Sequence, residues 1–320
     1  MTILLYFPII LIDIQFKGII MNFQKLQAHI LVLFATVLVA GSFIASEKLA
    51  GIISPFSLIL LRFLISILVL APIIMMKKNW KAQVKTALPR AMIMSLFYTG
   101  YFIILFESLK TTTSLHTGTL YTLVPLLTAL LYIVFFREKI TAVQFLVYAI
   151  GIIGTCGIIF KGDLNLLLSV SLNSGDTLFL FGILFMAMYS ISMKFLYRKD
   201  DTLVLVFCTF IGGAIWISIL LLILDIPLEW NLIQGDLVYD MAYLVIAATL
   251  MTTYLYQKAI IMIGPKSVMS YIYISPAAVA FLLFLMEGAS ISFPVIIAII
   301  ITTIATIILQ LSLNKKQAQM

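Results

Sequence analysis

Ten long apolar runs divide the sequence, and this pattern constrains the fold more than any other feature. Each run has about the 20 residues that an α-helix needs to cross the hydrocarbon core of a bilayer. Only 10% of all residues are charged, against about 25% in soluble domains. Strict alternation of polar and apolar residues is absent, which argues against a membrane β-barrel. The runs cover residues 28–46, 56–76, 88–106, 115–136, 142–160, 177–197, 203–224, 241–259, 267–286 and 291–313.

Helices are the expected form of these runs, because a bilayer offers no partners to unpaired backbone groups. The sequence therefore predicts an all-α membrane protein with ten transmembrane helices. If the N-terminus lies inside, sixteen of the 20 Lys and Arg residues fall in inner loops. This bias predicts a multi-pass protein of the cytoplasmic (inner) membrane with both termini in the cytoplasm. Residues 77–90 carry five of these charges and are expected to form a loop against the inner lipid headgroups.

Several classes of protein are excluded by the same charges and motifs. The net charge of +7 comes from inner loops, so no nucleic-acid partner is expected. No GxxxxGK[ST] motif is present, so the chain is not an ATP-driven pump by itself. The two histidines are far apart, and Cys156 and Cys208 lie in separate runs as apolar filler, so we expect no metal and no cofactor. The runs hold no polar catalytic cluster, and we expect no enzyme activity.

Residues 1–27 precede the first run and are expected to form an N-terminal cytoplasmic segment. Residues 3–12 are apolar but too short to span a bilayer, and no basic residue precedes them as in a signal peptide. Met21 begins a more ordinary start. We therefore interpret residues 1–20 as an over-extended start, with an interfacial segment as the alternative.

The same pattern of a proline, an apolar run and a glutamate motif occurs twice along the chain. The fourth of the first five runs contains Pro125, and the fourth of the last five contains Pro276. These runs end in the motif Glu-x-x-Ser/Thr, at residues 138–141 and 287–290. Residues 141–144, TAVQ, also have the form of a capping box for the next helix. The two halves of the chain therefore read as a duplicated unit.

The duplicated unit has an odd number of runs, and this determines its orientation. Two copies with five spans each enter the membrane in opposite senses, which is a common design of secondary transporters. We predict a first five-helix repeat at residues 28–160 and a second, inverted repeat at residues 175–313. In such proteins the substrate site lies near the bilayer midplane between the repeats.

Several segments resemble the EamA family of the drug/metabolite transporter (DMT) superfamily. The resemblance covers nearly the whole chain from about residue 28. Two positions depart from it, because Ala40 and Met186 stand where the family often has tryptophan. The segments that carry the resemblance are GSFIASEKLAGIISPFSLILLRFL (41–64), SLKTTTSLHTGTLYTLVPLLTALL (108–131), FFREKIT (135–141) with its weaker echo MEGASIS (286–292), and GDTLFLFGILFMAMYSISMKFL (175–196).

The resemblance implies a secondary-active or facilitative transporter that works by alternating access in the lipid bilayer. It implies a small-molecule substrate such as an amino acid, an amine or a drug, with export favoured over import. One alternative is an uptake carrier for a small metabolite such as a quaternary amine. A membrane scaffold subunit that transports nothing is the alternative from another class.

Arg62 is the clearest anomaly within the apolar runs. It is expected roughly 10 Å deep in the second run, where an ionisable residue is a functional candidate. The resemblance places an arginine here in relatives with unrelated substrates, which favours a structural ion pair with Glu47 or Glu107. Glu107 is otherwise a solvated loop acid or a coupling residue, and His116 is a weaker candidate of the same kind.

Aromatic side chains suggest a lined cavity. Tyrosines at span ends usually form interface belts, but several here lie well inside their runs. Ser190 and Ser270 could add hydrogen bonds, and Gln257 stands in the second half near the place of Glu107 in the first. Gly151, Gly154 and Gly157 predict close helix packing, with a homodimer face as the alternative. The tyrosine candidates are Tyr98, Tyr101, Tyr121, Tyr189, Tyr254, Tyr271 and Tyr273.

Overall fold

The computed structural model describes residues 7–49, 52–112, 114–168, 172–288 and 290–317. Of residues 7–22, 43, 44, 47, 114, 115, 287 and 314–317 it describes the backbone alone. These described ranges are helical and contain no β-strand, which confirms the prediction of an all-α protein. The first helices are α1 (Phe7–Leu49), α2 (Pro55–Met76), α3 (Lys78–Ser108), α4 (Ser114–Tyr121), α5 (Val124–Phe136), α6 (Ala142–Ile159) and α7 (Leu164–Leu168).

The remaining elements include one π-helical and one 3₁₀ segment, each continuous with α-helices on both sides. They are α8 (Ser174–Leu196), α9 (Thr202–Ile223), η1 (Trp230–Leu232), α10 (Leu237–Val245), the π-helix η2 (Ile246–Met251), α11 (Thr252–Ile263), α12 (Pro265–Met269), the 3₁₀ helix η3 (Ser270–Ile274), α13 (Ser275–Glu287) and α14 (Phe293–Gln317). Among the described residues, nine stretches are long and apolar enough to cross a membrane. One of them, Leu237–Met286, has 50 residues, and Gly264, with φ of 81°, divides it between α11 and α12. The count of ten spans stays a prediction.

α3 corrects one expectation, because residues 77–90 do not form a loop. α2 ends at Met76 and α3 begins at Lys78, so a single residue connects them. Trp80, Val84 and Leu88 pack against the hydrophobic core. Their spacing of four places them on one face of a helix. The expectation of a loop was based on the charges of this segment and overlooked this spacing.

Helices break before both of the prolines that recur in the two halves of the sequence. Pro125 lies in the first turn of α5 and Pro276 in the first turn of α13, where a missing N–H costs no hydrogen bond. α5 and α13 have 13 residues each. Each is followed by a left-handed residue, Arg137 (φ 55°) or Gly288 (φ 67°), at the same distance from its proline. The prolines therefore mark equivalent points in the two halves.

The predicted capping box at the start of α6 is confirmed. The backbone N–H of Gln144 donates to Thr141 Oγ1 at 3.2 Å, and the backbone N–H of Thr141 donates to Gln144 Oε1 at 3.1 Å. These two bonds satisfy backbone donors that a helix start leaves free.

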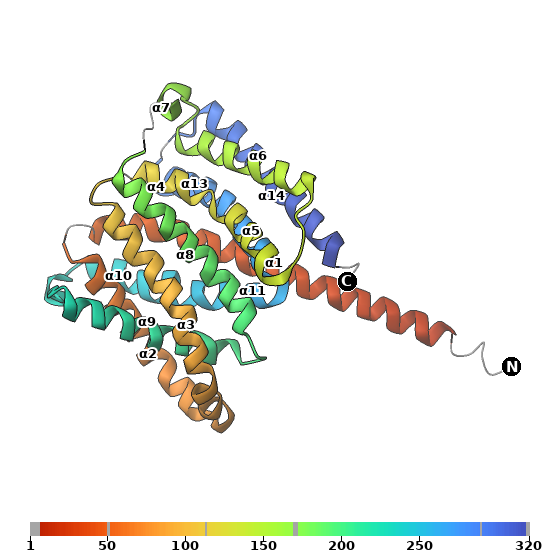
Figure 1. Cartoon of the computed structure of the whole chain (residues 1–320), viewed down its shortest axis with the longest axis horizontal. Helices are drawn as coiled ribbons and strands as arrows, with labels where there is room; N and C mark the ends of the chain where they lie inside the picture. The colour runs from red at the N-terminus through yellow and green to blue at the C-terminus, as the bar shows by residue number, and fades with distance from the viewer. Residues whose placement is uncertain (1–6, 50–51, 113, 169–171, 289, 318–320) are drawn as a thin grey trace.

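Helices from the two halves of the chain pack against each other throughout the bundle (Figure 1). α3 lies against α8 and α9, α2 against α9, α1 against α11 and α13, and α6 against α14. The N-terminal part of α1 extends beyond the other helices (Figure 1). The two halves of the chain therefore share their hydrophobic core.

The glycines of α6 serve this packing. A Cβ at Gly151 would lie 2.5 Å from the ring of Tyr273, and one at Gly154 would lie 2.8 Å from Thr302 of α14. The nearest atom to a Cβ at Gly157 is in Ala298 of α14. The glycine face is thus covered within the chain, as the packing interpretation expected, and is not free to form a dimer face.

Ion pairs between the halves lie at both ends of the bundle. At one end, here called the basic end, Arg90 pairs with Asp200 and Lys266 pairs with Glu138. Asp200 lies in the α8–α9 connection and Glu138 in the α5–α6 connection. At the opposite end Lys48 Nζ lies 3.2 Å from Asp240 Oδ1.

Candidate functional site

Five tyrosine hydroxyl groups converge deep inside the bundle. Rings of this set are in contact in two pairs, Tyr98 with Tyr189 and Tyr101 with Tyr121, and Tyr98 lies within electrostatic range of all four of the others. We call this set the tyrosine cluster; its members are Tyr98 and Tyr101 of α3, Tyr121 of α4, Tyr189 of α8 and Tyr256 of α11.

Tyr98 is also the centre of the ring contacts in this cluster. Its ring centroid lies 4.8 Å from that of Tyr189 and 5.2 Å from that of Phe102. Tyr101 and Tyr121 have ring centroids 5.8 Å apart. Aromatic pairs at such distances hold each other in place, so the hydroxyl groups have defined positions.

Arg62 of α2 lies beside this cluster. Its Nε donates a hydrogen bond of 2.7 Å to Thr249 Oγ1, and its guanidinium interacts electrostatically with Tyr98. Thr249 belongs to the π-helix η2 and donates in turn to the carbonyl of Leu244, five residues back, at 2.7 Å. Single π turns within α-helices are frequent at functional sites. Here the π turn presents the hydroxyl that orients the arginine.

Gln257 of α11 connects the cluster to α9. Its Nε2 donates to the Tyr189 hydroxyl at 3.2 Å and to Thr209 Oγ1 at 3.1 Å. The side chain is fully buried, and its Oε1 has no hydrogen-bond partner among the described residues. A buried polar atom of this kind is rare, and an ordered water is one group that could satisfy it.

Part of this site is incompletely buried despite its depth. Arg62, Tyr98, Tyr121 and Tyr256 are surrounded by the bundle, yet each keeps part of its surface accessible. Polar and ionisable groups inside a membrane protein normally face a water-filled cavity, the bundle interior or a partner.

The site lies where two groups of helices meet. α3 packs extensively on α8 and α9, and α2 packs extensively on α9. η2 and α11 reach this group through polar contacts: Thr249 with Arg62, Gln257 with Tyr189 and Thr209, and Thr253 Oγ1 with the Tyr98 hydroxyl at 3.4 Å.

Glu107 is not the partner of Arg62 in the described structure, which corrects that expectation. Its carboxylate lies 2.7 Å from Lys110 Nζ at the end of α3, and its side chain is 33% exposed. The nearby lysine and water stabilise its charge more cheaply than a buried arginine would. The side chain of Glu47, the other expected partner, lies outside the described residues.

His116 joins a polar junction at the bundle end opposite the basic end. Its Nδ1 lies 2.8 Å from Asp176 Oδ2, and Asp176 is fully buried. Thr112 also donates to this carboxylate, and Asp176 forms a capping box with Asn173 at the start of α8. The junction holds α4 and the α3–α4 connection against α8, away from the tyrosine cluster.

The remaining candidates also lie outside the cluster. Tyr254 accepts a hydrogen bond from Lys258 Nζ at 3.3 Å. Tyr271 bonds to His29 Nδ1 of α1 at 2.8 Å, and Tyr273 donates to the carbonyl of Tyr148 at 3.2 Å. Ser190 and Ser270 donate to carbonyls of their own helices.

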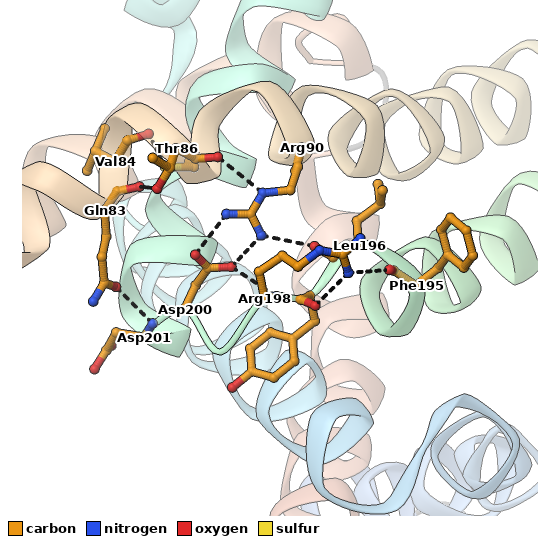
Figure 2. Close-up of polar contacts among 11 residues, drawn as sticks. Gln83, Val84, Thr86, Arg90, Phe195, Leu196, Arg198, Asp200 and Asp201 are labelled. Carbon is orange, nitrogen blue, oxygen red and sulfur yellow. Dashed lines mark hydrogen bonds and ion pairs between the residues drawn. The ribbon is translucent and has the colours of Figure 1, made fainter.

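A bidentate ion pair lies at the basic end, between α3 and the α8–α9 connection (Figure 2). Arg90 Nη1 donates to Asp200 Oδ2 at 2.7 Å, and Nη2 donates to Oδ1 at 2.9 Å. Nη1 also donates to the carbonyl of Leu196, and the N–H of Asp201 donates to Gln83 Oε1. The pair ties α3 of the first half to the α8–α9 connection of the second.

Sequence reasoning missed Thr209, Thr249, Thr253 and Tyr256 of this site. Thr249 and Thr253 recur at a spacing of four with the predicted Gln257 and, with Tyr256, lie on one helical face. This row of polar residues within an apolar run could have been recognised in the sequence. Thr209 has no such pattern, because its partner Gln257 comes from a distant segment.

The described structure is that of a multi-pass helical membrane protein with a polar, aromatic site in its interior. Residues 26–160 and 173–311 both match the EamA-like transporter family. The chain therefore belongs to the EamA-like transporter family. A solved crystal structure has 18% sequence identity and a TM-score of 0.72, and the match covers 90% of this chain and 98% of the solved one. That likeness concerns the fold alone. No curated protein matches the chain.

Proposed function

We propose that the chain is a ten-span secondary transporter that moves small polar or amphipathic metabolites by alternating access. Its two halves form inverted five-helix repeats, and both termini lie in the cytoplasm. One observation carries this proposal: Arg62 and the tyrosine cluster gather partly accessible polar groups between helices of the two halves. Substrate sites of inverted-repeat transporters lie at such a place.

Export is the direction that the family resemblance favours. The packing of α3 on α8 and α9, and of α2 on α9, supports a mechanism in which these four helices rock together against α1, η2 and α11. The site between the groups would then open to one side at a time, without ATP.

Reporter fusions test the topology. Fusions after residues 80, 198 and 316 are expected to report cytoplasm, because the basic residues gather in those segments. Fusions after residues 50, 165 and 232 are expected to report the outside. An even number of spans separates residues 80 and 198 in the proposed arrangement, so opposite locations for these two fusions would contradict it.

Flux measurements test the activity. Purified protein in ATP-free liposomes is expected to equilibrate or exchange at least one solute of a panel of amino acids, amines, organic acids and phosphate esters. Tyr98→Ala is expected to lower that flux about 10-fold, since aromatic contacts of the cluster contribute about 1 kcal/mol each. The matched control is Tyr239→Ala, because Tyr239 is an exposed tyrosine of α10.

A correctly folded protein that neither binds nor moves any solute of the panel would favour the scaffold alternative. Equal flux in Tyr98→Ala and wild type would show transport by a route that avoids the tyrosine cluster.

A further inference from the structure

The donors of Arg62 are only partly used. An arginine side chain carries N–H donors on Nε and on both Nη atoms. In the described residues Nε alone has a hydrogen-bond acceptor, Thr249 Oγ1 at 2.7 Å. Both Nη groups have no acceptor there, and the side chain keeps part of its surface accessible.

The charge of Arg62 is not compensated by the described side chains either. None of their carboxylates lies within 4 Å of its guanidinium, and Glu107 pairs elsewhere. A buried cation without a counter-charge is costly within a membrane. An anion that binds beside Arg62 would remove this cost, whereas a cation would increase it.

The geometry selects the kind of anion. Because Thr249 holds Nε, the two Nη groups present the end of the planar guanidinium, which matches carboxylate and phosphate oxygens in pairs. The hydroxyl of Tyr98 lies near the same guanidinium and can donate to a further oxygen. The rings of Tyr98, Tyr189 and Phe102 offer contact to an apolar body.

We propose that the site takes organic anions, and that the Nη groups of Arg62 bind the carboxylate or phosphate of the substrate. The identity of this anion as a transported substrate rests on the proposed function. Arg62 would thus bind the charged group of the substrate, while the tyrosine cluster contacts its organic body. A quaternary amine is not a substrate of such a site.

Four probes with one phenylalkyl or phenyl body and different head groups test the proposal: 3-phenylpropionate, phenyl phosphate, 3-phenylpropylamine and 3-phenylpropanamide. Binding is measured as the concentration-dependent rise in the unfolding temperature of the full-length protein in detergent. The carboxylate or the phosphate ester is expected to bind at least about 10-fold more tightly than the amine and the amide. The better of these two anions identifies the head group.

Variants then locate the binding group. Arg62→Gln is expected to weaken anion binding about 100-fold, because it removes a desolvated charge partner. Arg62→Lys keeps the charge but loses the planar fork, so a loss of about 10-fold is expected. Arg198→Gln is the matched control, since it removes the same charge from an exposed side chain at the basic end.

The outcomes separate this inference from the proposed function. Equal binding of amine, amide and anions, no anion binding by the folded wild type, or unchanged anion binding in Arg62→Gln would each overturn the inference. If Arg62→Gln does not fold, the affinity of Arg62→Lys decides in its place. Arg62-dependent anion binding without flux supports the inference and contradicts the transporter. Flux of an amine that Arg62→Gln leaves unchanged supports the transporter and overturns the inference.

Discussion

Asp200→Asn is expected to lower the free energy of unfolding by about 3 kcal/mol, because it leaves the guanidinium of Arg90 without its buried counter-charge. The carboxylate is 6% exposed and the guanidinium side chain 20% exposed, so water replaces little of the lost interaction. Denaturant titration in detergent micelles measures the change. Replacing both partners by leucine is expected to cost less than Asp200→Asn alone, since no unpaired charge then remains.

Glu107→Gln is the matched control for this change. It also converts a carboxylate to an amide in an ion pair, but Lys110 is 64% exposed and Glu107 33% exposed. A loss below about 1 kcal/mol is expected there. Equal losses in the two variants would contradict the assignment of Arg90 and Asp200 as a buried pair that ties the two halves together.

Acid provides an independent test of the same pair. Burial acts to raise the pKa of Asp200, but hydrogen bonds and charge from Arg90, with the N–H of Arg198, outweigh it and hold the pKa below its ordinary value. The stabilisation is therefore complete above the unfolded-state pKa of about 3.9 and is lost as the pH falls through the lower folded-state value. The difference in stability between wild type and Asp200→Asn should shrink below about pH 4.

Gly151→Ala is expected to lower the free energy of unfolding by about 2 kcal/mol through overpacking. The new Cβ would lie 2.5–2.9 Å from three atoms of the Tyr273 ring. This ring is fully buried, and its hydroxyl is bonded to the carbonyl of Tyr148, so it cannot turn away freely. Denaturant titration in micelles again measures the loss, and Tyr273→Leu in the same chain should restore part of it.

Gly118→Ala is the control on another helix. The nearest atom to its new Cβ lies 3.8 Å away, in Ile159, which is an ordinary contact. Since alanine also favours a helix by up to about 1 kcal/mol over glycine, this variant should be neutral or more stable. A destabilised Gly118→Ala beside an unchanged Gly151→Ala would show that α6 does not pack on η3 as described.

Much of the fold could be predicted because lipid leaves so few solutions. Apolar runs of sufficient length must be helices, and prolines in two equivalent runs predicted the breaks before α5 and α13. The segment 77–90 was misjudged because its charges were weighed before its periodicity. Trp80, Val84 and Leu88 form a helical face that packs on the core, and this packing extends α3 beyond the apolar run.

The candidate site was predictable in part. Arg62 was singled out by its charge alone, and tyrosines well inside the runs suggested a lined cavity. The sequence could not separate Tyr98 and Tyr189, which meet in the cluster, from Tyr271 and Tyr273, which bond to other helices. The distinction depends on helix rotation, which hydrophobic periodicity hardly specifies when nearly every residue is apolar.

The sequence by itself determined the class of this protein: apolar length, charge distribution and duplicated prolines sufficed for a helical membrane protein of two related halves. Only the tertiary structure decided which polar groups meet. Arg62 donates a hydrogen bond to Thr249 and does not pair with Glu107. Gln257 donates hydrogen bonds to Tyr189 and Thr209. The physical reason is that span formation is a local property of about 20 consecutive residues, whereas the pairing of buried polar groups depends on contacts between segments far apart in the chain.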